Sequence, residues 1–219
     1  MQINDLRHEI KFLQKNNDIN YLFHWIKNYT TFRKDYPDRI VNTIYLDNIY
    51  NQSATDNLIG ISNRKKYRIR WYGFDLTSIN FEIKIKKNKQ NFKKTFKLNQ
   101  SILSNINDNL FVYQQLNKLL IKHGVFLPDF IYPTLKVKYK RKYFKNHNGI
   151  RMTLDDDLSY SHPKFDKFFN IKNYKIIEFK FKSNEKNYLN QLFKKFYLYP
   201  TRHSKYLVGL SSFGYFNYL

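Results

Sequence analysis

Cysteine is absent from the 219 residues of the sequence. Disulfide bridges and thiolate metal sites are therefore excluded. Glycine is scarce, with six residues, and the sequence has no glycine-rich phosphate loop. No apolar run approaches the roughly 18 residues of a membrane-spanning helix. The start, MQINDLRHEIKF, lacks the apolar core of a signal peptide. We therefore expect a soluble, cytoplasmic protein.

Acidic residues are outnumbered, with 17 Asp and Glu against 39 Lys and Arg, and the formal net charge is +22. A balance this basic predicts an anionic partner that carries phosphate: a nucleic acid, a nucleotide, polyphosphate or an anionic lipid. Aromatic residues make up 19% of the chain, which argues against intrinsic disorder. Because no linker, repeat or low-complexity segment interrupts the sequence, we expect residues 1–219 to form a single domain.

Periodicity predicts an α+β fold built on antiparallel strands. Alternation of polar and apolar residues, typical of strands with one buried face, occurs over 6–12, 40–46, 64–72, 79–86, 135–144, 150–154 and 175–182. Helical spacing of apolar residues occurs over 17–29, 53–59, 99–122 and 187–196, and we expect a short tail after that. Gly73 and the turn at 146–149 favour hairpins between neighbouring strands.

Several of these strands carry charge on one face and apolar residues on the other. The charged positions are Arg7, Glu9 and Lys11 in the first strand and Lys66, Arg68 and Arg70 in the third. Successive members of such a row lie about 7 Å apart, from a rise of about 3.3 Å per residue. Arginine binds phosphate oxygens in pairs, so these rows suit a chain of phosphates. The alternative is a solvated strand face with local ion pairs.

One pattern, apolar-Glu-apolar-Lys-apolar-Lys, occurs twice, at 81–86 and at 177–182. It places Glu82 and Glu178 among cations. A carboxylate inside a basic cavity suits Mg²⁺ or Mn²⁺, which prefer oxygen ligands together with phosphate. Two exposed amphipathic strands are the alternative, but the recurrence of the pattern favours the functional interpretation.

Other candidate features favour ordinary roles. The six histidines include no i, i+4 pair, so we expect no histidine metal site. Asp155, Asp156 and Asp157 resemble a metal cluster, but three acids before a turn are more typical of a solvated segment. Basic residues interleaved with aromatic ones could instead bind RNA, and this alternative stays open.

Seven motifs in a fixed order resemble those of one known family. They are Arg7-x-Glu9-x-Lys11-Phe12, TIYLDN at 43–48, KYRIRWYG at 66–73, FEIK at 81–84, GIRMTLD at 149–155, IEFK at 177–180 and SKY at 204–206. In this order they resemble the polyphosphate polymerase domain of the vacuolar transporter chaperone family. That domain belongs to the triphosphate tunnel metalloenzymes, or CYTH-like superfamily. The resemblance covers nearly the whole chain.

The resemblance implies an antiparallel β-barrel tunnel with flanking helices. In that tunnel the γ-phosphate of ATP would pass to a growing polyphosphate chain, with Mn²⁺ or Mg²⁺ as cofactor. The residues that it assigns to the reaction are Lys11, Arg68, Arg70, Lys84, Arg151 and Lys205, with Arg141 and either Lys94 or Lys93 as further phosphate ligands and Glu178 as metal ligand. The strand pattern adds Lys66 and Lys180 to the phosphate ligands, and Glu9 and Glu82 to the metal ligands.

These assignments imply that the strands around Lys11, Arg68, Glu82, Arg151 and Glu178 close into one barrel with the side chains inward. The expected partners are ATP and polyphosphate; DNA is not expected, and association with a membrane partner is left open. In one strand, periodicity and resemblance disagree. Alternation over 135–144 groups Lys136, Lys138, Lys140 and Lys142 on one face, whereas the resemblance selects Arg141 on the other, and we follow the resemblance.

Two other functions stay open. The first is a metal-dependent tri- or polyphosphatase of the same fold, in which water replaces phosphate as the acceptor. The second is a non-catalytic basic module that binds polyphosphate or RNA and needs no acids. The stretch at 68–73 favours the polymerase over the phosphatase.

Overall fold

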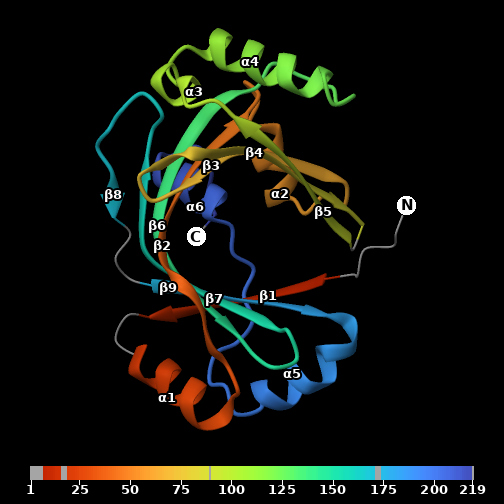
Figure 1. Cartoon of the computed structure of the whole chain (residues 1–219), viewed down its shortest axis with the longest axis vertical. Coiled ribbons are helices and arrows are strands. Elements are labelled where there is room, and N and C mark those ends of the chain that lie inside the picture. The colour runs from red at the N-terminus through yellow and green to blue at the C-terminus, as the bar shows by residue number, and fades with distance from the viewer. Residues whose placement is uncertain (1–6, 16–18, 89, 171–173, 219) are drawn as a thin grey trace. The chain divides into compact units, whose positions relative to one another are not determined.

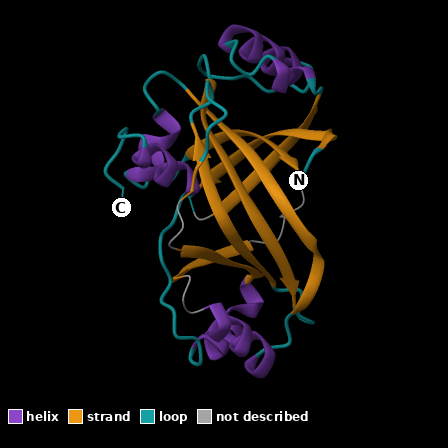
Figure 2. Ribbon diagram, turned by 90° about the vertical axis from the view of Figure 1, so that its left-hand side faces the viewer, coloured by secondary structure: helices purple, strands orange, loops and turns teal. Residues whose placement is uncertain are grey.

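The computed structural model describes residues 7–15, 19–88, 90–170 and 174–218. In this part of the chain, strands form one nine-stranded sheet, and helices flank it (Figures 1 and 2). The chain divides into two compact units. Unit 1 comprises Met1–Ile40, Tyr139–Leu158 and Asn170–His203, and unit 2 comprises Val41–Lys138, Ser159–Phe169 and Ser204–Leu219.

Three long strands belong partly to each unit. They are β2 (Arg33–Asp47), β6 (Tyr132–Lys145) and β7 (Arg151–Ser161). Unit 1 extends them in the order β1-β9-β7-β6-β2, where β1 is Arg7–Lys15 and β9 is Tyr174–Lys182. Its helices are α1 (Ile19–Tyr29) and α5 (Lys186–Phe193), the latter preceded by the 3-10 turn Ser183–Glu185. The short strand β8 (Phe169–Asn170) pairs with β7.

The core of unit 1 is aromatic. Phe12 on β1 and Phe179 on β9 are fully buried, with ring centroids 5.7 Å apart in edge contact. Trp25 of α1 is also fully buried and packs on Phe196 at 4.4 Å. Each such side chain stabilises the fold by about 2–3 kcal/mol through burial. Since strand side chains alternate between faces, the charged residues between these aromatics lie on the opposite face of the sheet.

Unit 2 extends the shared strands through β3 (Arg64–Tyr72), β4 (Asp75–Lys87) and β5 (Gln90–Leu98). Its helices are α2 (Gln52–Leu58), α3 (Ser101–Ser104), α4 (Asn109–Ile121) and α6 (Lys205–Ser212). Ile69 and Phe81 face each other across β3 and β4, and both join the core that Ile102 and Leu116 of α3 and α4 complete. Figure 1 shows α3 and α4 on one side of these strands. The charged residues therefore occupy the other face.

Helix α6 replaces the expected tail, and a buried carboxylate links it to β2. Asp47, 1% exposed, accepts hydrogen bonds from the Tyr206 hydroxyl at 2.9 Å and from the backbone N–H groups of Ser53 and Ala54 at the start of α2. Gly209 allows a close approach, since an added Cβ would lie 2.4 Å from the Leu135 side chain. This anchoring explains why Lys205–Ser212 folds as a helix although the sequence pattern did not predict one.

Most predicted elements are present with shifted ends, and three further differences add to the unpredicted α6 and β8. The expected helix 99–122 is two helices, because Asp108 caps α4 by accepting the N–H of Phe111 at 2.9 Å. Strand β5 was not predicted, although Phe92 and Phe96 alternate there with polar residues. Strand β2 begins well before the expected segment 40–46. Residues 6, 17 and 18 of the predicted elements lie outside the described residues.

The sheet has two ends, β1 and β5, so the hydrogen-bonded order of the described strands is open rather than that of a fully closed barrel. The pairings of β1 with β9, β2 with β3, β3 with β4, β4 with β5 and β7 with β9 are antiparallel. No helix in the described part of the chain is both long and apolar enough to cross a membrane.

Candidate phosphate-binding site

The charged face of β3, β4 and β5 gathers five cations around one acid. Antiparallel register places Arg68 opposite Glu82, Lys66 opposite Lys84, and Lys84 opposite Lys93. We define the cation array as Lys66, Arg68, Arg70, Lys84 and Lys93, with Glu82 at its centre. Its members come from three neighbouring strands of unit 2, so their backbone positions are fixed by the ladder rather than by loops.

Glu82 is held by three of these cations. Its Oε2 accepts from Nε and Nη2 of Arg68 at 2.7 and 2.6 Å and lies 3.8 Å from Nη1 of Arg70, and its Oε1 lies 3.0 Å from Nζ of Lys93. Burial alone would raise the pKa of Glu82, but the charges of Arg68, Arg70 and Lys93 outweigh it and lower the pKa to about 2. Glu82 therefore stays ionised and orients Arg68.

The predicted role of Glu82 as a metal ligand does not fit this geometry. Both carboxylate oxygens already contact cations, and Arg68 contacts one of them twice. A metal ion would have to displace a two-point arginine contact, which is among the stronger ion pairs in proteins. Arg70 is also held at a second point, because its Nε donates to Oγ1 of Thr43 at 3.3 Å.

Lysines form a row across the array, and Lys93 of this row pairs with Glu82. Lys66, Lys84 and Lys93 are direct neighbours on β3, β4 and β5. Like charges directly opposite each other destabilise a sheet, so a bound anion would stabilise such a row. Lys66 Nζ also donates to Oγ of Ser204 at 3.2 Å, which brings β3 beside the start of α6, where Lys205 stands. The predicted ligands Lys66, Arg68, Arg70, Lys84 and Lys205 thus all lie in unit 2.

Lys94, the predicted phosphate ligand on β5, lies on the wrong face. Its register partner is Ile83, a core residue, whereas Thr95 is the partner of Glu82 and Lys93 that of Lys84. Alternation along the strand therefore turns Lys94 away from the array and Lys93 toward it. Sequence reasoning named both lysines, and without the pairing of β5 it had no means to choose between them.

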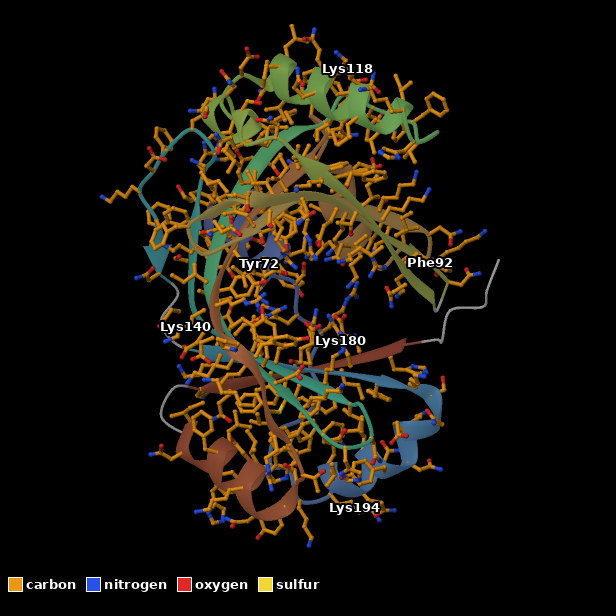
Figure 3. All side chains as sticks on the ribbon, viewed as in Figure 1. Tyr72, Phe92, Lys118, Lys140, Lys180 and Lys194 are labelled. Atoms are coloured by element: carbon orange, nitrogen blue, oxygen red, sulfur yellow. The ribbon has the colours of Figure 1, made fainter. Side chains whose placement is uncertain are left out.

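Unit 1 carries a second charged cluster, which we call the β1–β9 square: Glu9 and Lys11 on β1, and Glu178 and Lys180 on β9. Glu9 is opposite Lys180, and Lys11 is opposite Glu178. Lys11 Nζ lies 2.9 Å from Glu9 and 4.0 Å from Glu178, while Lys180 Nζ lies 2.6 Å from Glu178 and 3.9 Å from Glu9. Lys180 is labelled in Figure 3. Two acids and two cations thus alternate around the square.

Strand β7 adds a third column beside this square. Arg151 is opposite Lys180, and Thr153 is opposite Glu178. Arg151 is exposed, and the Oγ1 atom of Thr153 is buried with no hydrogen-bond partner among the described residues. A buried hydroxyl without a partner is costly, so an external group that binds beside Glu178 would satisfy it.

Glu9 and Glu178 fit a divalent cation better than Glu82 does. Their contacts within the square are with flexible lysines, and the Glu178 side chain is only 8% exposed. The described residues contain no group of three or more metal-ligating side chains. Mg²⁺ is commonly held by one or two carboxylates together with substrate phosphates, so two acids suffice.

Arg141 of β6 and Asp155 of β7 form a buried ion pair rather than an open site. Arg141 donates from Nε and Nη2 to Asp155 at 2.5 and 2.7 Å, and Asp155 is fully buried. Burial alone would lower the pKa of Arg141, but Asp155, with a smaller contribution from Glu178, raises it well above its usual value. Asp156 pairs with Lys175. The expectation of a solvated aspartate run was therefore wrong for these two residues.

Two N–H donors of Arg141 are bound to Asp155. Arg141 therefore stabilises unit 1 more than it serves as a phosphate ligand. The predicted residues thus separate into the cation array of unit 2 and the β1–β9 square with Arg151 in unit 1. Their convergence in one interior stays a prediction.

The sequence of the chain matches the model of the VTC domain family over residues 6–214. The chain belongs to the VTC domain family. No curated protein sequence matches this VTC domain.

Solved structures resemble it at low identity. A provisionally assigned adenylate cyclase from Bacillus halodurans is 13% identical, with a TM-score of 0.58 over 91% of this chain and 94% of that one. Another from Vibrio parahaemolyticus is 14% identical, with a TM-score of 0.55 over 94% and 98%. The PH1819 protein of Pyrococcus horikoshii is 16% identical, with a TM-score of 0.50 over 94% and 99%. The predicted fold class, the antiparallel sheet of tunnel proteins with flanking helices, is thereby confirmed.

Proposed function

We propose that this VTC domain is a metal-dependent polyphosphate polymerase that transfers the γ-phosphate of ATP to a growing polyphosphate chain. The row of Lys66, Lys84 and Lys93 carries the proposal. Adjacent ammonium groups, in an array where five cations surround the single carboxylate of Glu82, favour a ligand with closely spaced negative charges. A phosphate chain is such a ligand, and family membership agrees with it.

In this function the protein positions phosphates and supplies no nucleophile. An oxygen of the terminal phosphate of the acceptor attacks the γ-phosphorus, the bond from that phosphorus to the bridging oxygen of ADP breaks, and ADP leaves with the electron pair. Arg68, oriented by Glu82, and Arg70, anchored by Thr43, offer donors to the phosphate oxygens. Fixed donors stabilise the charge of the transferring phosphoryl group without reorganising.

Glu9 and Glu178 are the residues that would hold the Mn²⁺ or Mg²⁺ ion. When bound, the ion would neutralise charge on the phosphate oxygens. Lys11 and Lys180 hold the two carboxylates side by side through ion pairs. The unpartnered Thr153 hydroxyl opposite Glu178 offers a further oxygen beside this pair.

Buried acids among the cations argue against a non-catalytic basic module. Such a module needs only cations, yet Glu82 and Glu178 are 5% and 6% exposed and each is held by cations. Placing a carboxylate there weakens the attraction for phosphate, so its presence suggests that geometry or a metal ion matters to the reaction.

Incubation of the purified protein with ATP and Mn²⁺ tests the proposal. We expect long-chain polyphosphate and ADP as products, with little orthophosphate. The matched variant is Arg68→Gln with Arg70→Gln, which removes two phosphate donors and should abolish the product, and its melting temperature shows whether the strands remain folded without these partners of Glu82. Orthophosphate as the sole product, with and without a polyphosphate primer, would assign the protein to the phosphatases instead.

A further inference from the structure

A basic groove lies in unit 2 where the end of β5 meets α3 and α4. Its volume is about 290 Å³. The described residues that line it include three lysines and three neutral polar side chains but no carboxylate: Lys97, Lys118, Lys122, Asn99, Ser101 and Gln115. Leu98, Ile102 and Leu119 complete it with apolar side chains. Figure 3 labels Lys118 on α4. The groove is therefore suited to an anion.

The two lysines of this groove that lie on α4 and at its C-cap are close enough to repel each other. Lys118 and Lys122 are four residues apart on α4 and at its C-cap, where like charges repel. Attraction to the negative end of the helix dipole offsets part of that repulsion. Lys97, which comes from a different element and lines the same groove, lies close enough to Asp75 for electrostatic attraction.

Lys97, at the end of the edge strand, links the groove to the cation array. Lys97 is opposite Asn80, which is itself opposite Arg70 of the array. On β5, Lys93, Thr95 and Lys97 share one face, and the two lysines are about 13 Å apart along the strand. The face that carries the array and the groove on the side of α3 and α4 therefore meet at Lys97, on the edge of the sheet and within unit 2.

We propose that this groove is a second binding site for inorganic polyphosphate, which follows the edge strand β5 from the cation array to Lys97, Lys118 and Lys122. The proposal rests on the proposed function, since it takes the array as the site of the reacting phosphates. It adds a place where the distal part of a long chain binds while its terminal phosphate occupies the array. Short triphosphates cannot reach both places, so the groove selects for chain length.

Polyphosphate suits the groove better than RNA does. The residues that line it include no aromatic side chain. Proteins that bind single-stranded nucleic acid combine cations with aromatic rings on which the bases stack. A groove of lysines and small polar groups offers a base no ring to stack on, but it does offer donors to phosphate oxygens.

Edge protection is the competing explanation for the lysine on β5. Exposed edge strands often carry lysine because its charge prevents pairing with another chain. That role would explain Lys97 alone, and it predicts aggregation when the lysine is replaced. It predicts no link between Lys97 and the lysines of α4.

The experiment measures binding of two probes, inorganic tripolyphosphate and long-chain polyphosphate, to the full chain. The test variant combines Lys97→Gln, Lys118→Gln and Lys122→Gln. The matched control combines Lys164→Gln, Lys167→Gln and Lys194→Gln, which removes the same charge from exposed lysines elsewhere. We expect the test variant to lose about tenfold in affinity for the long chain, at up to about 0.5–1 kcal/mol per exposed charge contact, and to keep its affinity for tripolyphosphate within about twofold. The control should change little for either probe.

Equal losses of affinity in the test and control variants, or no loss of affinity for the long chain, would contradict a polyphosphate site in the groove. The proposal would also be contradicted if single-stranded RNA competed for the groove as strongly as polyphosphate of equal charge. If tripolyphosphate fails to bind while long polyphosphate still requires the three lysines, the proposed polymerase function fails and the groove stands. Melting temperatures of both variants confirm that the protein remains folded.

Discussion

Strands β4 and β9 carry the same pattern, Glu followed by two alternating lysines, yet their acids have different partners. Opposite Glu82 stands Arg68, and opposite Glu178 stands Lys11. Arg68 contacts Glu82 twice at 2.6–2.7 Å, whereas Lys11 is 4.0 Å from Glu178. A planar guanidinium fixes a carboxylate, while an ammonium on a flexible stem can move aside. The neighbouring strand therefore decides what holds the acid of this motif: Glu82 is held by a two-point arginine contact, and Glu178 by lysines, of which Lys180 lies 2.6 Å away.

The largest expected effect of that difference is on catalysis. Glu178→Gln keeps the shape of the side chain and removes its charge. If Glu178 holds the metal ion, metal-dependent turnover should fall about a hundredfold or more, while metal-free nucleotide affinity largely survives because the cations remain. Turnover at limiting Mn²⁺, metal-free affinity and melting temperature, all on this variant, provide the measurement.

A different pattern would contradict the assignment. If Glu178 is only the ion-pair partner of Lys180, its replacement should lower the melting temperature and leave turnover of the folded fraction near normal. Near-normal turnover at limiting Mn²⁺ would show that the metal binds elsewhere.

Glu82→Gln should act mainly on stability. It leaves Arg68, Arg70 and Lys93 without the carboxylate that they share, at a cost of about 2 kcal/mol, less than for a fully buried pair because Lys93 is half exposed. Tripolyphosphate should restore part of the melting temperature by replacing the lost negative charge. Denaturant unfolding with and without tripolyphosphate measures both effects, and Thr95→Ser, on the same face, is a control that changes no charge. A stable variant with normal phosphate affinity would mean that Glu82 does not organise the array.

Lowering the pH should weaken the ion pairs of Glu82 with its cations in the wild-type protein. The pKa of Glu82 is lowered from 4.5 to about 2, so its ionised form contributes stability above pH 4.5, and this contribution is lost as the pH falls through about 2. The difference in unfolding free energy between wild type and Glu82→Gln should therefore be constant above pH 5 and shrink steadily between pH 4 and 2. A difference that does not change over this range would separate the stability loss from the charge of Glu82.

Much of the fold followed from periodicity, because alternation marks strands wherever one face is buried. It identified the faces of β3, β4 and β9, and hence Arg68, Arg70 and Glu178, from spacing alone. Periodicity could not identify the residues that pair across neighbouring strands. Spacing along one strand does not indicate which residue stands opposite, so the sequence did not predict the two-point contact of Arg68 with Glu82.

The remaining errors have the same physical origin. Asp155 looks solvated in the sequence, yet it is buried by Arg141 from a different strand. Helix α6 has little signal of its own, and its anchor, Tyr206 on Asp47, joins residues far apart in the chain. Long-range contacts override local preference at these places.

The smallest expected effect tests the register of β5, which the sequence could not determine. Lys93 and Lys94 are neighbours in the chain with the same charge, but only Lys93 faces Glu82 and Lys84. Lys93→Gln should weaken tripolyphosphate binding about fivefold, or about 1 kcal/mol, whereas Lys94→Gln should change it less than about twofold. Isothermal titration at two salt concentrations measures both variants, and the salt dependence should decrease only for Lys93→Gln, because only that variant removes a phosphate contact. Equal losses from the two variants would mean that tripolyphosphate responds to the net charge of the hairpin rather than to the array, and the register of β5 would then have no bearing on binding.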